Sequence, residues 1–432
     1  MLAEVFYQQG TQMSDQHRQF LTGIFETAVR AADPVEALKG RLPGRPKGRT
    51  IVIGAGKGAA QLAQAFETLW PHPFEGVVVT RYGYGAPCQT IRVLEAAHPV
   101  PDAAGLQAAK ALKDAVKGLE PDDLVIALIC GGGSSLLPDP PDGLELKDLQ
   151  DLNTALLASG APISVMNDIR KCFSGINGGR LAELAAPAAV HSFIVSDVPG
   201  DAPGEVASGP TVLARPKPSD VLATIEARGI RLPTALLNHL REQRTLPPTP
   251  SNQLTIEVIA SAAQSLDAAA SAARAQGVNA WVLSDSIEGE ARDVASVHAA
   301  LARQVAKSDF PFTAPVVLLS GGETTVTLRH KGRGGRNGEF QLALAIALEG
   351  HENIHSLAAD TDGIDGSEDN AGAFVDGHTV NRMRKAGLDP HRYLQKNDAY
   401  TAFLTVDALF MTGPTGTNVN DFRAILIGDP PC

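Results

Sequence analysis

The sequence predicts an α/β fold of two domains, and three observations support this prediction. Short apolar segments typical of buried strands alternate with alanine-rich segments typical of helices. Apolar strands separated by helices are typical of a largely parallel sheet that is covered on both faces. The chain has 432 residues, which is more than one hydrophobic core usually holds, so we expect two or three domains with a ligand-binding cleft between them.

The predicted elements follow one another regularly along the chain. A helical stretch over residues 15–42 ends at a Pro-Gly-Arg-Pro segment, and strands and helices alternate after it. The expected strands are residues 50–53, 76–79, 124–129, 192–195, 255–260, 279–283, 315–319, 356–359 and 424–427. Residues 245–251 include three prolines, which interrupt helices and sheets, so we place the domain boundary there, between residues 1–245 and residues 251–432.

Composition argues against several classes of function. The chain carries 37 Lys and Arg against 48 Asp and Glu, a net charge of −11, which argues against broad contacts with nucleic acid or an anionic membrane. The cysteines are scattered without a CxxC pair, so we expect neither disulfides nor structural zinc. No apolar run reaches the ~18 residues of a membrane span, and residues 1–10 lack a signal-peptide pattern. We therefore expect a cytoplasmic protein.

The first candidate site follows the strand at residues 50–53, where Gly54, Gly56 and Lys57 precede a helix expected over residues 58–70. Such a turn directs backbone N–H groups and the positive end of the helix dipole at an anion. Dinucleotide-binding turns use uncharged glycines, whereas phosphoryl transfer commonly needs a cation near the moving phosphate. Lys57 therefore favours phosphate chemistry over hydride transfer.

A run of glycines and serines follows the strand at residues 124–129 and reads Cys130-Gly131-Gly132-Gly133-Ser134-Ser135. Three glycines and two hydroxyl groups form a backbone nest suited to phosphate oxygens. The alternative is a tight turn in which Ser134 or Ser135 caps the next helix. We interpret Cys130 as a small buried apolar residue, because the sequence shows no histidine partner that would activate it as a nucleophile.

Asp197 stands where the strand at residues 192–195 ends, which is where open α/β sheets place catalytic groups. An aspartate at this position can hold Mg²⁺ or accept the proton of a substrate hydroxyl. An Asx turn that closes the strand is an equally good interpretation.

The second half of the chain repeats the pattern of a strand followed by glycines, at Ser320, Gly321 and Gly322. Downstream, Arg336 and Asn337 begin a helix, and a cation at that end opposes the helix dipole. We therefore interpret Arg336 as a clamp for an anionic ligand.

Four further positions are candidates with structural alternatives of similar weight. Asp362 follows a strand and suits a Mg²⁺-linked polar site or a hydrogen-bonded turn. Asn418 and Asn420 lie in a segment rich in small polar residues that lines a nucleotide or closes a loop. Arg180 suits an anion or a salt bridge within a helix. We rank His98 lower, because a lone histidine near prolines is more often structural.

Taken in order, these segments resemble the glycerate 2-kinases of the MOFRL type, a family also named hydroxypyruvate reductases. The resemblance covers most of the chain and is carried by Gly54-Ala55-Gly56-Lys57, His98-Pro99-Val100-Pro101-Asp102, Gly131-Gly132-Gly133-Ser134, Gly178-Gly179-Arg180-Leu181-Ala182, Ser196-Asp197-Val198-Pro199-Gly200-Asp201, Ser208-Gly209-Pro210-Thr211, Gly335-Arg336-Asn337, Asp362-Gly363-Ile364-Asp365-Gly366 and Thr417-Asn418-Val419-Asn420-Asp421. The chain departs from the family pattern at Tyr84, Cys130, Cys172, Asn177 and Gly338.

The resemblance implies an enzyme that uses ATP and Mg²⁺ to phosphorylate the 2-hydroxyl of D-glycerate. It also implies a Rossmann-like N-terminal domain with a largely parallel sheet, a smaller α/β C-terminal MOFRL domain, and an active site in the cleft between them. The residues that match Lys57 and Arg336 are implied to be central to catalysis. The expected partners are ATP and D-glycerate, without nucleic acid or membrane, and the sequence leaves open whether the chain is a monomer or a homodimer.

Two other classes of function stay open at this point. A nicotinamide-dependent hydroxypyruvate reductase needs an acidic residue for the ribose about 20 residues after its glycines, where this chain has Thr80 and Arg81. An arginine there suits the 2′-phosphate of NADPH. A non-catalytic phosphosugar-binding module would have a similar sheet and similar nests, but it would not need Asp197, Asp362 and two convergent cations.

Overall fold

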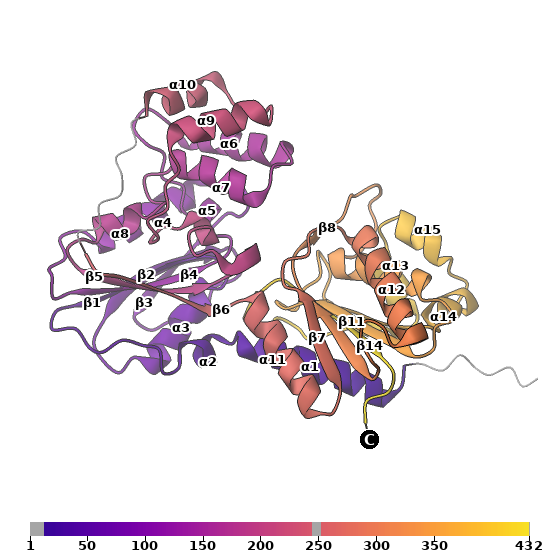
Figure 1. Cartoon of the computed structure of the whole chain (residues 1–432). Coiled ribbons are helices and arrows are strands. Elements are labelled where there is room, and N and C mark those ends of the chain that lie inside the picture. Colours follow the sequence, from indigo (N-terminus) through magenta and orange to yellow (C-terminus); the bar gives the residue numbers. More distant parts are fainter. Residues whose placement is uncertain (1–12, 244–251, 432) are drawn as a thin grey trace, which may run out of the picture. The chain divides into compact units, whose positions relative to one another are not determined.

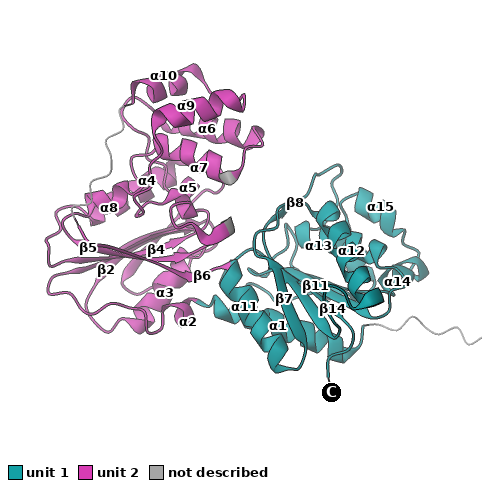
Figure 2. Cartoon of the chain, in the orientation of Figure 1, with its two compact units in different colours: residues 1–33, 262–432 teal, residues 34–261 magenta. Residues whose placement is uncertain are grey.

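The computed structural model describes residues 13–243 and 252–431. Its contacts divide the chain into two compact units, residues 34–261 and residues 1–33 together with 262–432 (Figures 1 and 2). We call the first the parallel-sheet unit and the second the mixed-sheet unit. The proline-rich boundary predicted at residues 245–251 lies outside the described residues.

The parallel-sheet unit is built on a six-stranded sheet whose strands are all parallel. Its strands are β1 (Thr50–Ala55), β2 (Glu75–Arg81), β3 (Ile91–Ala96), β4 (Leu124–Cys130), β5 (Ala189–Val195) and β6 (Leu254–Ala260). The strand order is β3-β2-β1-β4-β5-β6, which is the order of doubly wound dinucleotide-binding sheets. Ligands of such sheets bind where the order reverses, at the carboxyl ends of the two central strands, which here are β1 and β4.

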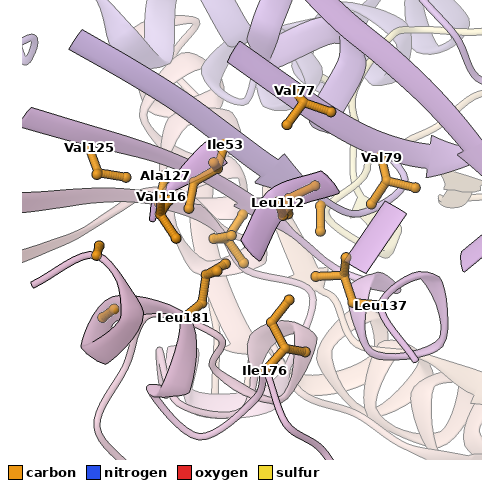
Figure 3. Packing of buried hydrophobic residues seen from close by; sticks show 14 of the residues in the cluster. Ile53, Val77, Val79, Leu112, Val116, Val125, Ala127, Leu137, Ile176 and Leu181 are labelled. Carbon is orange, nitrogen blue, oxygen red and sulfur yellow. The ribbon is translucent and has the colours of Figure 1, made fainter. Parts of the chain in front are cut away.

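Helices cover both faces of this sheet, as expected for strands that are apolar on both sides. The helices of this unit are α2 (Pro34–Leu38), α3 (Ala59–Leu69), α4 (Ala103–Ala115), α5 (Gly133–Leu136), α6 (Leu146–Ala158), α7 (Ile163–Cys172), α8 (Arg180–Leu184), α9 (Pro218–Ala227) and α10 (Thr234–Glu242), with short 3₁₀ turns η1 (Pro199–Asp201) and η2 (Val206–Ser208). On one face, Leu112 of α4 and Leu181 of α8 pack on alternate strand residues such as Ile53 and Val77 (Figure 3). The opposite face contacts α3.

Helices α6, α7, α9 and α10 form a small apolar cluster of their own beside this core. Phe173, at the end of α7, and Leu236 of α10 are buried in it. This cluster fixes the position of α7, whose polar residues take part in the site described below.

The mixed-sheet unit contains a second six-stranded sheet, ordered β13-β12-β11-β14-β9-β7, and a two-stranded pair of β8 and β10. Its strands are β7 (Asn279–Ser284), β8 (Gly289–Glu290), β9 (Val316–Ser320), β10 (Thr324–Thr325), β11 (Ile354–Asp360), β12 (Gly372–Asp376), β13 (Leu409–Phe410) and β14 (Asp421–Ile427). Its helices are α1 (Asp15–Ala31), α11 (Ala262–Ala275), α12 (Ala291–Ser308), α13 (Arg336–Ala347), α14 (Thr379–Lys385), α15 (Pro390–Gln395) and α16 (Ala399–Thr405).

Only β7 and β9 are parallel in the larger of these sheets, and the other neighbours are antiparallel. The parallel arrangement expected from the apolar strands therefore holds for the first sheet and is wrong for most of the second. Both faces of the second sheet are also covered, by α1 and α11 on one side and by α12 and α13 on the other. Burial on both faces makes a strand apolar throughout whichever way its neighbours run, so the pattern could not distinguish the two cases.

The first helix belongs to the mixed-sheet unit, whereas the predicted division placed it with the N-terminal domain. The predicted helical stretch over residues 15–42 is divided into α1 and α2 at residues 32–33, and the two helices belong to different units. Phe20, Leu21 and Phe25 of α1 are buried against α11 and the second sheet. All strands predicted from apolar runs are found, while β3, β12 and the two-residue strands were not predicted. No helix within the described part of the chain is both long enough and apolar enough to span a bilayer.

Candidate active site

Lys57 and the glycine run lie together at the switch point of the parallel sheet. Lys57 follows β1 and the run follows β4, and the Lys57 backbone N–H donates a hydrogen bond of 2.9 Å to the carbonyl oxygen of Gly131. The hydroxyl of Thr80, at the end of β2, donates to the Lys57 carbonyl oxygen at 3.0 Å. These bonds fix the backbone of Lys57 and leave its ammonium group available to a ligand.

Two glycines of the run are required by close approaches. A Cβ atom at Gly131 would lie 1.6 Å from a carboxylate oxygen of Asp197, so only glycine lets Asp197 fold over the turn. Gly132 has φ 79° and lies against the side chains of both His98 and Lys57. The structure therefore brings Lys57, the glycine run and Asp197 together, as the sequence predicted for the ends of β1, β4 and β5.

The hydroxyl of Ser134 is tied to a strained turn at η2. The Oγ atoms of Ser134 and Ser208 are 2.8 Å apart, and Ser208 donates to Oδ1 of Asn167 at 3.3 Å. Ala207 and Ser208 have φ of 53° and 58°, in the left-handed region that costs a non-glycine residue about 1 kcal/mol. Such strain persists where the surrounding packing imposes it, often at functional sites.

Positive charge gathers at this edge without carboxylate partners. Among the residues that the structure describes, Lys57, Arg81 and Arg170 form no ion pair: Arg81 lies over the ring of Tyr84, and Arg170 donates to Asn153 and Asn167. Burial lowers the pKa of His98 to about 4, and Lys57, Arg81 and Arg170 lower it further in the same direction. His98 is therefore neutral at pH 7, and the edge suits a polyanion.

Two other predicted positions of this unit have internal roles. Arg180 donates to the carbonyl oxygens of Lys171 and Asn177 at 2.9 and 2.8 Å, so it holds the preceding loop rather than pointing to the glycine run. Cys130 is buried under the turn, and burial, together with Asp197, raises the pKa of its thiol. A protonated thiol is a poor nucleophile, which agrees with the interpretation of Cys130 as a small apolar residue.

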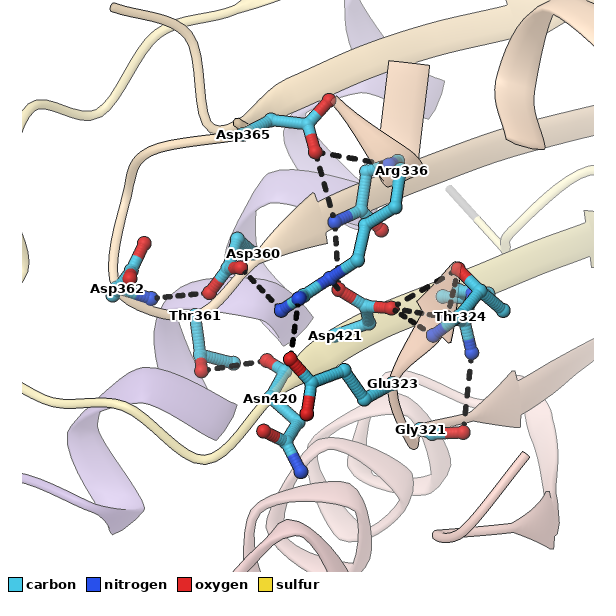
Figure 4. Close-up of polar contacts among 12 residues, drawn as sticks. Gly321, Glu323, Thr324, Arg336, Asp360, Thr361, Asp362, Asp365, Asn420 and Asp421 are labelled. Carbon is cyan, nitrogen blue, oxygen red and sulfur yellow. Dashed lines mark hydrogen bonds and ion pairs between the residues drawn. The ribbon is translucent and has the colours of Figure 1, made fainter. Parts of the chain in front are cut away.

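In the mixed-sheet unit, Arg336 is surrounded by three carboxylates (Figure 4). Its Nε lies 2.6 Å from Asp421, and its two terminal nitrogens lie 2.7 Å from Glu323 and 2.7 Å from Asp360. Burial opposes the charged guanidinium, but these carboxylates outweigh it and raise the pKa of Arg336. The positive charge of Arg336 at the start of α13 was expected to need an anion nearby, and these three carboxylates of the protein itself provide it.

Asp421 is the centre of this cluster. Besides Arg336 it contacts Arg423, and it accepts a hydrogen bond of 2.8 Å from the side-chain amide of Asn337. Burial favours the neutral acid, yet Arg336 and Arg423 together lower the pKa of Asp421. Asp421 therefore stays charged although its side chain is fully buried.

The neighbouring acids behave differently. Burial raises the pKa of Asp360 well above its usual value against the opposing effect of Arg336, and Asp362 and Asp421 add to the rise. Burial raises the pKa of Asp365 to about 6, although the backbone N–H groups of Asn337 and Gly338 donate to its carboxylate at 2.9 and 2.7 Å. Asp360 and Asp365 are therefore the members of the cluster that take up protons most readily.

The remaining predicted residues of this unit make mainly local bonds. Ser320 is bonded to His298 at 2.9 Å, and the Gly321 N–H donates to the Ser284 carbonyl, so neither of these groups is available to a ligand. Asp362 and Asn418 close turns by accepting from the backbone two residues on. Gly322 and Asn420 are buried next to the Arg336 cluster.

Sequence reasoning missed the partners of Arg336 and the cations around His98. Glu323, Asp360 and Asp421 are far apart in sequence and meet only because β11 and β14 are neighbours and β10 precedes α13. One local signal was present: Asp421 and Arg423 alternate on an apolar strand, so they point to the same face, where two opposite charges imply further charged partners.

Comparisons with known proteins agree over nearly the whole chain. One family model, described as a domain of unknown function, DUF4147, matches residues 20–241, and the MOFRL family model matches residues 316–421. A protein of Agrobacterium vitis named putative hydroxypyruvate reductase is 49% identical over 95% of this chain and 94% of its own length. The D-glycerate 2-kinase of Thermotoga maritima is 39% identical over 94% of this chain and 97% of its own length. A crystal structure of glycerate kinase from Thermotoga maritima is similar with a TM-score of 0.87 and 37% identity, covering 96% of this chain and 100% of that chain.

Proposed function

The chain belongs to the MOFRL family of glycerate kinases, and from this membership we propose that it transfers the γ-phosphoryl group of ATP to the 2-hydroxyl of D-glycerate. The observation that carries the proposal is the edge of the parallel sheet, where Lys57, Arg81 and Arg170 have no carboxylate partner among the described residues. A triphosphate and the carboxylate of the acceptor together supply the negative charge that such an edge lacks. The transition state of phosphoryl transfer spreads charge over several oxygens, so positioned cations are the main catalytic device.

In this proposal Lys57 is the cation that contacts the transferred phosphoryl group, and the run Gly131–Ser135 holds phosphate oxygens. Gly54 lies within β1 and packs closely against β4, so only Gly56, in the turn after the strand, is assigned to bring the backbone close to the ligand. Support comes from the hydrogen bond between the backbone N–H of Lys57 and the carbonyl oxygen of Gly131, since it shows that the two segments are adjacent. The hydroxyls of Ser134 and Ser135 are bonded to Ser208 and to the Gly132 carbonyl oxygen in the free protein, so they would have to turn toward the phosphate to act as neutral donors.

Arg336 is assigned to the same phosphoryl group as a second cation. Its three carboxylate partners hold the guanidinium in one orientation, and a cation that is already oriented does not have to reorganise when charge develops. Gly322, Asn337, Asp362, Asn418 and Asn420 are assigned to nucleotide binding or to the support of Arg336. Ser320, Gly321 and Arg180 receive no direct role, because internal hydrogen bonds use their polar groups.

Asp197 fits the requirement for a magnesium ligand. Its half-buried carboxylate lies directly over Gly131 in the glycine run, and carboxylate oxygens together with phosphate oxygens are the ligands that Mg²⁺ prefers. Bound Mg²⁺ would neutralise part of the phosphate charge. In the alternative role, Asp197 accepts a hydrogen bond from the 2-hydroxyl and orients it for attack.

The experiment is an assay of the purified chain with ATP, Mg²⁺ and D-glycerate, in which NMR identifies the phosphorylated carbon. We expect the 2-phosphate. A parallel assay follows oxidation of NADPH with hydroxypyruvate, because Arg81 at the end of β2 also suits a 2′-phosphate. NADPH oxidation without phosphoryl transfer, or formation of the 3-phosphate, would contradict the proposal.

A further inference from the structure

A small cavity in the parallel-sheet unit adjoins the glycine run. Its volume is about 50 Å³, enough for a few water molecules or a carboxylate-sized group. Ser134 and Ser135 line it on the side of the run, and Arg170, Asn153 and Asn177 line it from other elements. The rest of the wall is mostly apolar and includes Leu137, Leu149, Leu152 and Phe173.

Arg170 brings a positive charge to this cavity, and the one carboxylate among the lining residues, Asp139, is paired with Lys113 at 2.7 Å rather than with Arg170. It lies in the last turn of α7, and its guanidinium donates to the amide oxygens of Asn153 at 2.8 Å and Asn167 at 3.1 Å. Both partners are neutral, and no described carboxylate forms an ion pair with it. Burial lowers the pKa of Arg170, but an arginine remains charged in proteins. A charge in such surroundings is stabilised when an anion binds beside it.

Asn177 provides an independent indication of a ligand. Only 3% of its surface is exposed, and its side-chain Oδ1 has no hydrogen-bond partner among the described residues. Leaving a buried amide oxygen unpaired costs about 1–3 kcal/mol. The amide can be turned, so its end in the cavity either accepts from a hydroxyl or donates to a carboxylate.

We propose that this cavity binds the acceptor, with the carboxylate of a short 2-hydroxy acid on Arg170 and a hydroxyl on Asn177. This assignment deepens the proposed function and rests on it. The planar guanidinium matches the two oxygens of a carboxylate, and the apolar wall excludes a triphosphate. Since the cavity and the glycine run share Ser134 and Ser135, D-glycerate bound there with its 3-hydroxyl on Asn177 has its 2-hydroxyl next to the phosphates. The glycine run is then left entirely to the nucleotide.

The test compares Arg170→Met with Arg215→Met. Arg215 is a half-buried arginine of the same unit that pairs with Glu183 and does not line the cavity, so it is a matched control. Losing a charge-assisted hydrogen bond costs roughly 10- to 100-fold in affinity. We expect Arg170→Met to raise the KM for D-glycerate by about this factor while the KM for ATP stays within about two-fold. Arg215→Met should leave both values within about two-fold. An unchanged KM for D-glycerate in Arg170→Met would overturn the proposal.

A binding readout separates this proposal from the proposed function. In thermal shift measurements without ATP, D-glycerate, glycolate and D-lactate should stabilise the wild-type protein, whereas the uncharged amide of D-glycerate should not. Arg170→Met should lose the response to all three acids. If the wild type binds these acids through Arg170 but transfers no phosphoryl group, the kinase proposal fails and the cavity assignment stands. If Arg170→Met responds like the wild type, the cavity assignment fails.

Two further variants keep the test decisive if Arg170→Met does not fold. Arg170→Lys keeps the charge, loses the planar fork, and should show the same selective rise in the KM for D-glycerate. Asn177→Leu removes an unpaired buried amide, so we expect a higher Tm without ligand together with weaker binding of D-glycerate. A lower Tm with unchanged binding would show that Asn177 has a purely structural role and would contradict its assignment.

Discussion

Arg336 in the mixed-sheet unit and Lys57 in the parallel-sheet unit are both assigned to the phosphoryl group, but their surroundings are opposite. Arg336 contacts three carboxylates. Lys57 lies near two other cations, Arg81 and Arg170, and has no ion pair within the described part of the chain. The charge of Arg336 is neutralised by the protein before any ligand binds, whereas the charge of Lys57 is left for the ligand to neutralise.

This difference separates two uses of a positive charge. The carboxylates around Arg336 reduce its attraction for an anion but fix its position, so its contribution is mainly orientation. Lys57, Arg81 and Arg170 all act on His98 in the same direction, so this edge has a net positive field that binding of an anion would neutralise. The same substitution should therefore act differently in the two units, with a large effect on stability in one and on catalysis alone in the other.

The largest effect is expected for Arg336→Met. It leaves Asp421 and Asp360 buried without their main cation, and breaking a buried ion pair on one side costs about 3–5 kcal/mol. Urea unfolding should show this loss, and turnover should fall with it. As the control, Arg333→Met removes a neighbouring arginine that pairs with Glu368 at the surface, and its effect on unfolding should be small. Equal stability of the two variants would break the comparison.

The next effect is on the rate alone. Lys57→Ala removes a cation from the transition state, so we expect kcat to fall about 10²- to 10³-fold. The free energy of unfolding should stay the same or rise, because no ion pair is lost and repulsion with Arg81 and Arg170 decreases. Steady-state kinetics and urea unfolding of the same preparation check both halves of this expectation. Near-full turnover would falsify the role of Lys57, and a large loss of stability would remove the contrast with Arg336.

A smaller effect concerns the dependence of stability on pH. Burial and the three cations lower the pKa of His98 to about 4 from an ordinary value of 6.5. Between these two pH values the unfolded chain binds a proton that the folded protein does not bind, so the free energy of unfolding falls as the pH decreases. His98 does not reduce the stability above pH 6.5, and the loss that it causes grows as the pH falls and reaches at most about 3 kcal/mol below pH 4.

His98→Gln should remove that part of the pH dependence. Urea unfolding of the wild type and the variant at a series of pH values from 7 to 4 gives the comparison, and the variant should lose less stability than the wild type as the pH falls. An equal loss of stability with falling pH in the two proteins would mean that the cations do not lower the pKa of His98. The proposal that this edge of the sheet is positively charged would then lose its main evidence.

The smallest effect is expected for a neutral donor of the same edge. Ser134→Ala removes the hydrogen bond to Ser208, so the free energy of unfolding should fall by about 1 kcal/mol. The KM for ATP should rise only a few-fold, because a neutral hydroxyl contributes less to phosphate binding than a cation does. A fall in turnover as large as that of Lys57→Ala would mean that hydroxyl donors, and not only cations, stabilise the transition state.

Much of the fold could be predicted from local sequence. Buried strands such as β4 are apolar throughout, and glycines at their ends mark the turns, so the strands and the edge that carries the site followed directly. The less apolar β3, with Arg92 and Glu95, gave no such signal. The direction of neighbouring strands and the unit to which α1 belongs depend on tertiary packing, because an amphipathic helix does not specify which sheet its apolar face covers.

The candidate site was predictable to a similar degree. Lys57, the glycine run and Asp197 follow strands of one parallel sheet, so their proximity is a consequence of topology. Arg336 was predicted to be functional because its charge opposes the helix dipole. The carboxylates that form ion pairs with it come from distant segments, so the sequence did not identify them as its partners. Arg170 and Asn177 gave no signal either, since a charged or amide residue on a helix or in a loop is usually solvated, and only the packing of α7 turns them toward a cavity.

The position of α1 has a consequence for how the protein is made. Residues 34–261 form a continuous stretch of chain, whereas α1 packs against α11, β11 and β14, which all follow that stretch. The partners of Phe20, Leu21 and Phe25 therefore begin to appear with α11 and are complete only when the last strand, β14, has been synthesised. Helix α1 is thus synthesised before the parallel-sheet unit but is fully buried only after it, and an apolar surface exposed for that long is a natural target for chaperones and a starting point for aggregation.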